Sequence, residues 1–388
     1  MRRWRFLAAT TAALSAPLAL VHCDADVPGP SDVTTAPDCG PAAAQDAGVA
    51  DASDPRCGTQ PQLITVHPHA VAQDSALGSN LVDARGYNGR IYFGYGDIDA
   101  NTGPIVISSY DPTAKEWRDH LTFDTERIER FRVIGDELWA PATDPHGAED
   151  PEYAKGSARH EWSQVDAGRS IKVLDAVERV PGDVFLVGSD LYLSDAGTFD
   201  NTFGAAAWRA QNGAPFERAF PIINPDPFQD YQYVDMNELP FLNAAALDGK
   251  LYTASVALVR VFDGATWSKG PQLGGFIHPI TFAGRIVFGA LGELWAFDGT
   301  HRTRLGIQLL ETTLSYTFIT EPIAVLNDSE GHLLVVNANG ETLVTADLTE
   351  WHCIGRAPED VRSIGSLNGT VYFGGPEGRV YAYPEPSW

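Results

Sequence analysis

The stretch Asn88-Gly89-Arg90-Ile91-Tyr92-Phe93-Gly94 decides the fold, because it joins a tight turn to an apolar strand-like run. An Asn-Gly pair supplies the positive φ angles that a two-residue β-hairpin turn requires at the least steric cost. Related stretches recur as Asp248-Gly249-Lys-Leu-Tyr-Thr and Asn368-Gly369-Thr-Val-Tyr-Phe. Each of these stretches predicts the turn and second strand of a β-hairpin.

A glycine followed by an apolar run of this kind occurs seven times, at intervals of 35 to 67 residues. The seven glycines are Gly89, Gly135, Gly182, Gly249, Gly284, Gly331 and Gly369. A third strand-like run follows several of the hairpins and ends in an aromatic residue and an aspartate, as in residues 105–111, 258–263 and 293–298. A repeat of roughly 40–50 residues is typical of a four-stranded propeller blade, with insertions in some blades.

The two ends of the repeat region complete this pattern. The last unit has three strand-like runs, in residues 361–367, 370–373 and 379–383. The separate run Gln62-Leu-Ile-Thr-Val66 can supply its fourth strand, which would close the ring and remove an exposed sheet edge. The sequence therefore predicts an all-β fold, a seven-bladed β-propeller of four-stranded antiparallel blades closed by an N-terminal strand.

One blade carries a family resemblance. Tyr110-Asp-Pro-Thr-Ala-Lys-Glu-Trp117 resembles the kelch family of propellers, whose galactose-oxidase-like blades have a Tyr and a Trp separated by six residues. The segments 263–267 and 347–351 match this kelch pattern less closely and are also similar to Asp-box turns. The resemblance implies a propeller and brings no active site with it, because such propellers include both enzymes and binding proteins.

The chain begins with features of an export signal. Arg2, Arg3 and Arg5 precede an apolar run at residues 6–21, so residues 1–22 are predicted to be a signal peptide. Leu20-Val21-His22-Cys23 resembles a bacterial lipobox, which predicts lipidation of Cys23, with ordinary signal-peptidase cleavage as the alternative. Residues 23–60 are rich in Asp, Ala and Pro and predict a disordered acidic tether, and residues 61–388 predict a single propeller domain.

Export would place the cysteines in an oxidising compartment, where disulfides form. With Cys23 lipidated, Cys39, Cys57 and Cys353 remain. One disulfide is expected, either Cys39–Cys57 or Cys57–Cys353, and the sequence leaves both pairings open. The predicted location is the bacterial cell envelope, lipid-anchored in the periplasm or at the outer membrane, or outside the cell.

The composition restricts the partners. A net charge of −24 repels nucleic acid and anionic lipid, so we expect no nucleic-acid partner and membrane contact only through a lipid anchor. The protein is expected to be a monomer.

Long loops in the first three units are the predicted binding region, at residues 96–103, 143–162 and 188–203, together with the connection 221–240. Aromatic and acidic side chains in these loops could stack on sugar rings and hydrogen-bond hydroxyls, or could hold a cationic peptide. Equally, the loops could simply pack on one another. The candidate ligand-binding residues are Asp97, Asp99, Asn101, His146, Tyr153, Tyr192, Tyr231, Tyr233 and Asp235.

Asp97-Ile-Asp99-Ala-Asn101-Thr-Gly103 places oxygen side chains at alternate positions, as Ca²⁺ loops do. Ca²⁺ is therefore the candidate ion, although an acidic turn that bonds its own backbone would give the same pattern. No organic cofactor and no catalytic residue is predicted. The leading hypothesis is a non-enzymatic binding or scaffolding protein for a glycan or protein; the alternative is a carbohydrate-active enzyme, a glycoside hydrolase or polysaccharide lyase that uses loop carboxylates.

Overall fold

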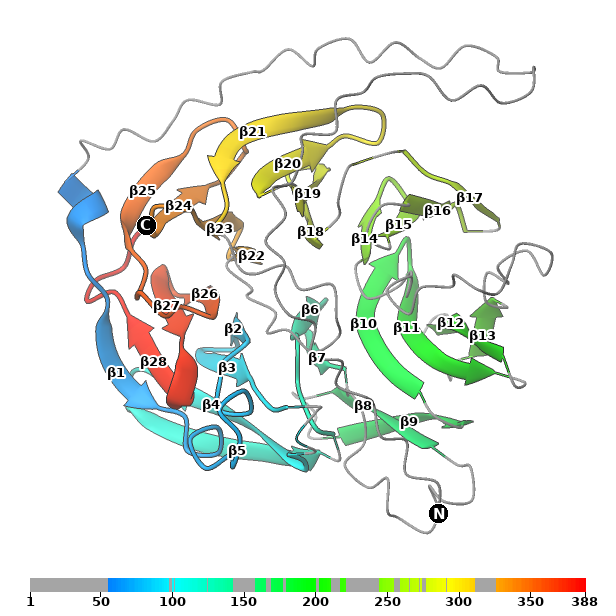
Figure 1. The fold of residues 1–388 in the computed structure, drawn as a ribbon, viewed down its shortest axis with the longest axis horizontal. Coiled ribbons are helices and arrows are strands. Elements are labelled where there is room, and N and C mark those ends of the chain that lie inside the picture. Colours follow the sequence, from blue (N-terminus) through cyan, green and yellow to red (C-terminus); the bar gives the residue numbers. More distant parts are fainter. Residues whose placement is uncertain are drawn as a thin grey trace, which may run out of the picture. The chain divides into compact units, whose positions relative to one another are not determined.

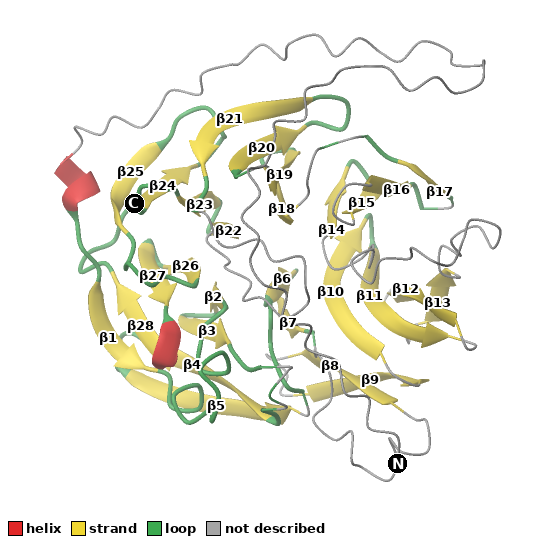
Figure 2. Cartoon of the chain, in the orientation of Figure 1, coloured by secondary structure: helices red, strands yellow, loops and turns green. Residues whose placement is uncertain are grey.

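The computed structural model describes residues 55–97, 100, 102–123, 125–141, 158–164, 169–176, 179–199, 202–210, 217–220, 244–254, 259–264, 266–271, 273, 277–290, 292–310 and 326–388. This part of the chain is all-β and almost without helix, since its helical segments are the short 3₁₀ turns η1 (Pro55–Gly58) and η4 (Pro376–Gly378) (Figure 2). The predicted signal peptide and the lipidation site Cys23 lie outside the described residues.

Within the described residues, the strands form seven four-stranded antiparallel sheets (Figure 1). Sheet 1 contains β2 (Asp83–Tyr87), β3 (Arg90–Gly94), β4 (Ile105–Asp111) and β5 (Glu116–Phe123). Sheet 2 contains β6 (Arg132–Ile134), β7 (Glu137–Ala140), β8 (Ala158–Gln164) and β9 (Arg169–Ala176). Sheet 3 contains β10 (Arg179–Val187), β11 (Asp190–Phe199), β12 (Thr202–Ala210) and β13 (Glu217–Phe220).

The remaining sheets repeat this order. Sheet 4 contains β14 (Ala244–Leu247), β15 (Lys250–Ala254), β16 (Val259–Phe262) and β17 (Trp267–Lys269). Sheet 5 contains β18 (Ile277–Phe282), β19 (Arg285–Ala290), β20 (Glu293–Phe297) and β21 (Arg302–Gln308). Sheet 6 contains β22 (Leu326–Ser329), β23 (His332–Val336), β24 (Glu341–Thr345) and β25 (His352–Arg356).

Sheet 7 is built from both ends of the described chain. It contains β26 (Ser363–Leu367), β27 (Thr370–Gly374), β28 (Arg379–Ala382) and β1 (Gln62–Val66). β1 pairs antiparallel with β28 as the outer strand of the sheet, and the two lie side by side in Figure 1. A disulfide between Cys57 in η1 and Cys353 in β25 joins the segment before β1 to sheet 6, so the second of the two pairings left open by the sequence is the one formed.

The predicted hairpin turns are confirmed at Asn88-Gly89, Asp248-Gly249 and Asn368-Gly369. All six residues have positive φ, from 49° to 75°, and each pair connects the first and second strands of a sheet. The left-handed conformation explains why Asn, Asp and Gly occupy these positions.

The predicted position of the first hairpin turn in sheet 3 was wrong. Gly182 was expected to form the hairpin turn, but it lies inside β10, where the register shifts between Pro181 and Val184. The turn is formed instead by Gly188, with φ 61°, and Ser189. Residues 191–199, predicted to be loop, therefore form most of β11.

Neighbouring sheets contact one another mainly through their first strands. These contacts join β6 to β10, β10 to β14, β14 to β18, β18 to β22 and β22 to β26, and β26 also contacts β2. Apolar side chains of facing strands fill the space between sheets; Ile91 and Phe93 of sheet 1, for example, share a core with Val380 of sheet 7 and Leu138 of sheet 2.

Candidate functional site

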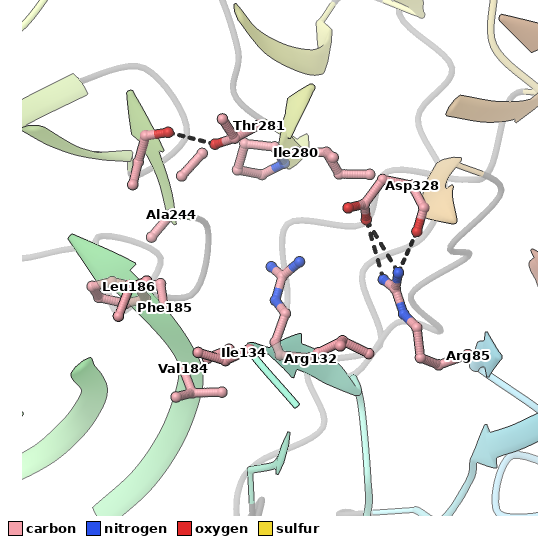
Figure 3. A pocket seen from close by; sticks show the side chains of 15 residues that line it. Arg85, Arg132, Ile134, Val184, Phe185, Leu186, Ala244, Ile280, Thr281 and Asp328 are labelled. Atoms are coloured by element: carbon pink, nitrogen blue, oxygen red, sulfur yellow. Dashed lines mark hydrogen bonds and ion pairs between the residues drawn. The ribbon is translucent and has the colours of Figure 1, made fainter. Parts of the chain in front are cut away.

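The first strands of six sheets line one cavity of about 380 Å³. Residues from β2, β6, β10, β14, β18 and β22 all contribute (Figure 3). The lining residues are Arg85, Arg132, Val133, Ile134, Gly135, Val184, Phe185, Leu186, Ala244, Ala245, Ala246, Pro279, Ile280, Thr281 and Asp328. A cavity of this size falls within the range of small-molecule sites.

Arg85 of β2 and Asp328 of β22 form an ion pair on one wall of the cavity. The guanidinium Nη1 and Nη2 each lie 3.3 Å from Asp328 Oδ1, and Nη1 also donates to the Asp328 carbonyl oxygen. Arg85 is only 7% exposed. A buried guanidinium held at several points keeps a fixed orientation, because guanidinium donors form a rigid planar fork.

The first strands that carry this pair are held in register by a buried amide. Asn327 Nδ2, beside Asp328, donates to the carbonyl oxygens of Ala84 and Ile364, each at 2.7 Å. Glycines allow the backbones to approach: a Cβ on Gly86 would lie 1.9 Å from the Ser366 carbonyl oxygen. The positions of Arg85 and Asp328 therefore follow from close packing of β2, β26 and β22.

Arg132 of β6 is the second cation of the cavity. Figure 3 shows its guanidinium projecting into the space between Ala244, Ile280 and Asp328. The buried carboxylate of Asp83, whose charge interacts with that of Arg132, accepts a hydrogen bond of 2.6 Å from the Phe131 backbone N–H. Burial raises the pKa of Asp83, and the charges of Arg85, Arg130 and Arg132 act in the opposite direction.

The described lining residues carry more positive than negative charge, within a strongly acidic chain. Two arginines and one aspartate among them leave a net charge of +1, whereas the whole chain has a net charge of −24. Counting Arg130 and an ionised Asp83 as well, three positive and two negative charges again leave +1.

The other walls of the cavity are apolar. Val184 and Phe185 of β10 and Ile280 of β18 are buried, and Ile134 of β6 also lines the cavity. Leu186 also lines the cavity but is 45% exposed, so it lies where the cavity meets solvent. The arrangement can bind a molecule that presents an anion to the arginines and an apolar surface to these side chains.

The two predicted site residues that the structure describes, Asp97 and Tyr192, do not line the cavity. Asp97 is buried, and its Oδ2 accepts a hydrogen bond of 2.7 Å from Ser75 Oγ. Its Oδ1 accepts a weaker one of 3.3 Å from the Ala100 N–H, so Asp97 bonds the backbone of its own turn. Tyr192 was predicted to be a loop residue; this is wrong, because it lies in β11 and pairs with Phe185 and Arg209.

Seven of the nine predicted site residues lie outside the described residues. These residues are Asp99, Asn101, His146, Tyr153, Tyr231, Tyr233 and Asp235. Among the residues that are described, no cluster of three or more His, Cys, Asp or Glu side chains could hold a metal ion.

Sequence reasoning missed Arg85, Arg132 and Asp328, although a signal was present. Each lies three or four residues before a hairpin glycine, Gly89, Gly135 or Gly331. That position belongs to the first strand of a sheet, where the cavity is lined. Charged residues at this position of otherwise apolar repeats would have indicated a shared site.

Comparisons with known proteins found similarity to solved structures. No family model matches the chain, and neither does any curated protein. Among solved structures, the extracellular domain of a one-component system from B. thetaiotaomicron is 12% identical with a TM-score of 0.48, over 84% of this chain and 40% of that chain.

Two further structures are similar at the same level. The β-propeller domain of the Trilobed protease from Pyrococcus furiosus is 9% identical with a TM-score of 0.45, over 80% of this chain and 95% of that one. BamB from Moraxella catarrhalis is 14% identical with a TM-score of 0.40, over 78% of this chain and 85% of that one. At these values the likeness says nothing about activity, ligand or partner.

Proposed function

We propose that the protein is an exported, non-enzymatic binding propeller that takes its ligand at the cavity between its first strands. The observation that carries this proposal is the convergence of first strands from six sheets on one cavity with a charged and an apolar side. A rigid scaffold that presents many short strands to one cavity is a common way to build a binding site.

The proposed architecture is a seven-bladed ring closed by β1. It is supported by the antiparallel pairing of β1 with β28 and by the contact between β26 and β2. Side-chain hydrogen bonds across this junction add further support, such as Ser363 Oγ to the Leu81 carbonyl oxygen at 2.7 Å. The kelch-like character proposed from Tyr110 and Trp117 is consistent with the packing of these two rings, whose centroids are 5.3 Å apart.

The proposed ligand is a glycan or a protein segment. Loops of the first three blades would extend the cavity with the aromatic and acidic residues predicted from the sequence, and the segment 97–103 remains a proposed Ca²⁺ loop. Binding is favoured over glycoside hydrolysis because Asp328 is the one carboxylate among the described lining residues. Glycosidases use a pair of carboxylates across the scissile bond.

The proposed location is the bacterial envelope, with a lipid on Cys23 and residues 24–60 as a tether. Among described residues, the structure contains no helix long and apolar enough to cross a membrane. Membrane fractionation tests the anchor: Cys23→Ser should move the protein to the soluble fraction. An unchanged distribution would contradict lipidation.

Glycan and peptide arrays, followed by an assay for cleavage products, test the binding function. Ala246→Trp would fill part of the cavity and should abolish array binding. Ala114→Trp, on the exposed turn between β4 and β5, is the matched control and should bind normally. Ala100→Trp probes the predicted loop region separately. Cleavage of a bound glycan, or full binding by Ala246→Trp, would contradict the proposal.

A further inference from the structure

We propose that Asn88-Gly89, the turn between β2 and β3, is a site of spontaneous deamidation, and that Glu330 protects the equivalent turn Asn368-Gly369 from the same reaction. The reaction consumes water and releases ammonia, so it is independent of any ligand in the cavity. It would convert one exposed amide of sheet 1 into a carboxylate and leave the corresponding amide of sheet 7 intact.

The reaction begins at the backbone nitrogen that follows the asparagine. The Gly89 nitrogen, after losing its proton, attacks the side-chain carbonyl carbon of Asn88, and a new C–N bond forms. The C–N bond to the side-chain amide breaks, and the amide takes up a proton and leaves as ammonia. Water then opens either carbonyl of the succinimide ring, which gives aspartate or isoaspartate. Asparagine is thermolabile in general, and a following glycine has no Cβ to obstruct the attack.

The two turns have the same local geometry. Asn88 and Gly89 have φ angles of 49° and 74°, and Asn368 and Gly369 have 51° and 75°. Each pair joins the first and second strands of a sheet, and both asparagines are exposed. Since sequence and backbone conformation are matched, a difference in reactivity must come from the groups around each glycine.

Glu330, in the turn between β22 and β23, holds the second pair. Its Oε2 accepts a hydrogen bond of 3.0 Å from the Gly369 N–H, and its Oε1 accepts one from the Asn368 N–H. A carboxylate at this distance opposes loss of the N–H proton, and a charge-assisted hydrogen bond must break before the nitrogen can attack. The Gly369 carbonyl oxygen is also held, by the Ser387 N–H at 2.7 Å.

Gly89 has no such contacts. Within the part of the chain that the structure describes, its N–H donates no hydrogen bond, and a Cβ placed on it would meet no atom within 4 Å. A third pair, Asn339-Gly340, lies between β23 and β24, and its Gly340 N–H donates to the Asn337 carbonyl oxygen at 2.9 Å. Of the three Asn-Gly pairs among the described residues, Asn88-Gly89 therefore has the glycine nitrogen that is open to react.

The two products would affect the turn differently. Asp248-Gly249 forms the same kind of turn in sheet 4, with φ angles of 51° and 71°, so aspartate at position 88 is compatible with the fold. Isoaspartate instead routes the main chain through the side-chain carbon and lengthens it. Tyr87 pairs directly with Arg90, which leaves a two-residue connection. We therefore expect isoaspartate to disturb the pairing of β2 with β3.

Peptide mapping of the purified full chain by mass spectrometry tests the proposal. The protein is kept in warm, mildly alkaline buffer, and samples are digested at acidic pH to prevent further reaction. Asn88 should deamidate at least about tenfold faster than Asn368, the factor expected for breaking one hydrogen bond to a charged group. In chain unfolded by urea, the two asparagines should react at nearly equal rates, because both have the same following residue.

Variants of Glu330 separate the effect of its carboxylate from that of the fold. Glu330→Ala frees the Gly369 N–H and should raise the rate at Asn368 about tenfold. Glu330→Gln keeps the size of the side chain, loses its charge and should give an intermediate rate, which serves if the alanine variant fails to fold. Glu350→Ala, at an exposed glutamate in the turn between β24 and β25 of the same sheet, is the matched control and should leave both rates unchanged.

Thermal unfolding of aged protein measures the effect of isoaspartate. Aged protein should unfold at a lower temperature than Asn88→Asp, which carries the aspartyl product alone, and aged Asn88→Gln is the control for other damage. Equal rates at Asn88 and Asn368 in the folded protein, or an unchanged rate at Asn368 in both Glu330 variants, would overturn the proposal. Equal stability of aged protein and Asn88→Asp would overturn the effect assigned to isoaspartate.

Discussion

Replacing Cys57 with serine removes the covalent link between η1 and β25. The bond spans 296 residues of sequence, from the segment before β1 to sheet 6. Without it, the unfolded chain gains the entropy of a very long open loop. The Arg356 N–H to Thr59 carbonyl hydrogen bond of 2.9 Å would then be left to hold the two segments together.

The magnitude follows from the length of the loop. The chain-entropy relation gives about 5–6 kcal/mol for a loop of this size, and losses of native disulfides measured in small domains are roughly 2–5 kcal/mol. We therefore expect Cys57→Ser to lower the free energy of unfolding by about 3–5 kcal/mol. For a domain of this length, that corresponds to a fall in Tm of roughly 4–7 °C.

Thermal and urea unfolding, followed by tryptophan fluorescence, measure the effect. Trp351 is 5% exposed and lies two residues from Cys353, so it reports on this part of sheet 6. Dithiothreitol should destabilise the unmodified protein by the same amount and leave Cys57→Ser unaffected. Cys39→Ser is the control and should retain the full response to the reductant.

Two results would refute this reasoning. If Cys39→Ser abolished the response to dithiothreitol, the pairing would involve Cys39 rather than Cys353. If Cys57→Ser unfolded at the same temperature as the unmodified protein, η1 would not constrain the fold.

Three further predictions concern the junction of the first and last sheets. His67 is buried, bonds Ser108 Oγ through Nε2 at 3.0 Å, and has its pKa lowered to about 3 by burial. Because the unfolded chain protonates it near 6.5 and the folded chain does not, stability is lost as pH falls from 6.5 towards 3. The free energy of urea unfolding should fall between pH 7 and pH 4.5, and this fall should be about 2.5 kcal/mol smaller in His67→Asn; an unchanged fall would assign the acid sensitivity to other groups. Gly86→Ala should destabilise by about 2–4 kcal/mol in the same assay, since its Cβ would meet the Ser366 carbonyl, whereas Gly89→Asn, in an open left-handed turn, should cost less than about 1 kcal/mol. Asn327→Ala removes two backbone-directed hydrogen bonds and should cost about 2–3 kcal/mol, with Asn339→Ala in an exposed turn as the comparison; equal losses in the two variants would contradict the role of Asn327.

The local structure was predictable where one short segment determines it. Asn88-Gly89 and Gln62–Val66 were assigned correctly, because a hairpin turn and a β-branched run need no distant partner to be recognised. Sheet 3 was misread because Gly182 and Gly188 are both followed by strand-like residues, and only pairing with β11 shows which glycine turns the chain.

The cavity was not predictable in the same way. Arg85, Arg132 and Asp328 are separated by up to 243 residues and meet only when neighbouring first strands pack. The loop residues chosen from composition, such as Tyr192, were selected for their type without knowledge of their strand register. Choice between the two disulfide pairings likewise depended on a contact between η1 and β25 that no local pattern encodes.

The composition of sheet 7 also has a consequence for how the chain is made. β1 is synthesised before every other strand of the described chain, and its partner β28 is synthesised after all of them. Until β28 has been synthesised, β1 has no partner strand in sheet 7. Likewise, Cys57 cannot form its disulfide until Cys353 has been synthesised. The sheet can therefore form only after β28 has been synthesised, and loss of residues 379–388 would remove the strand with which β1 pairs.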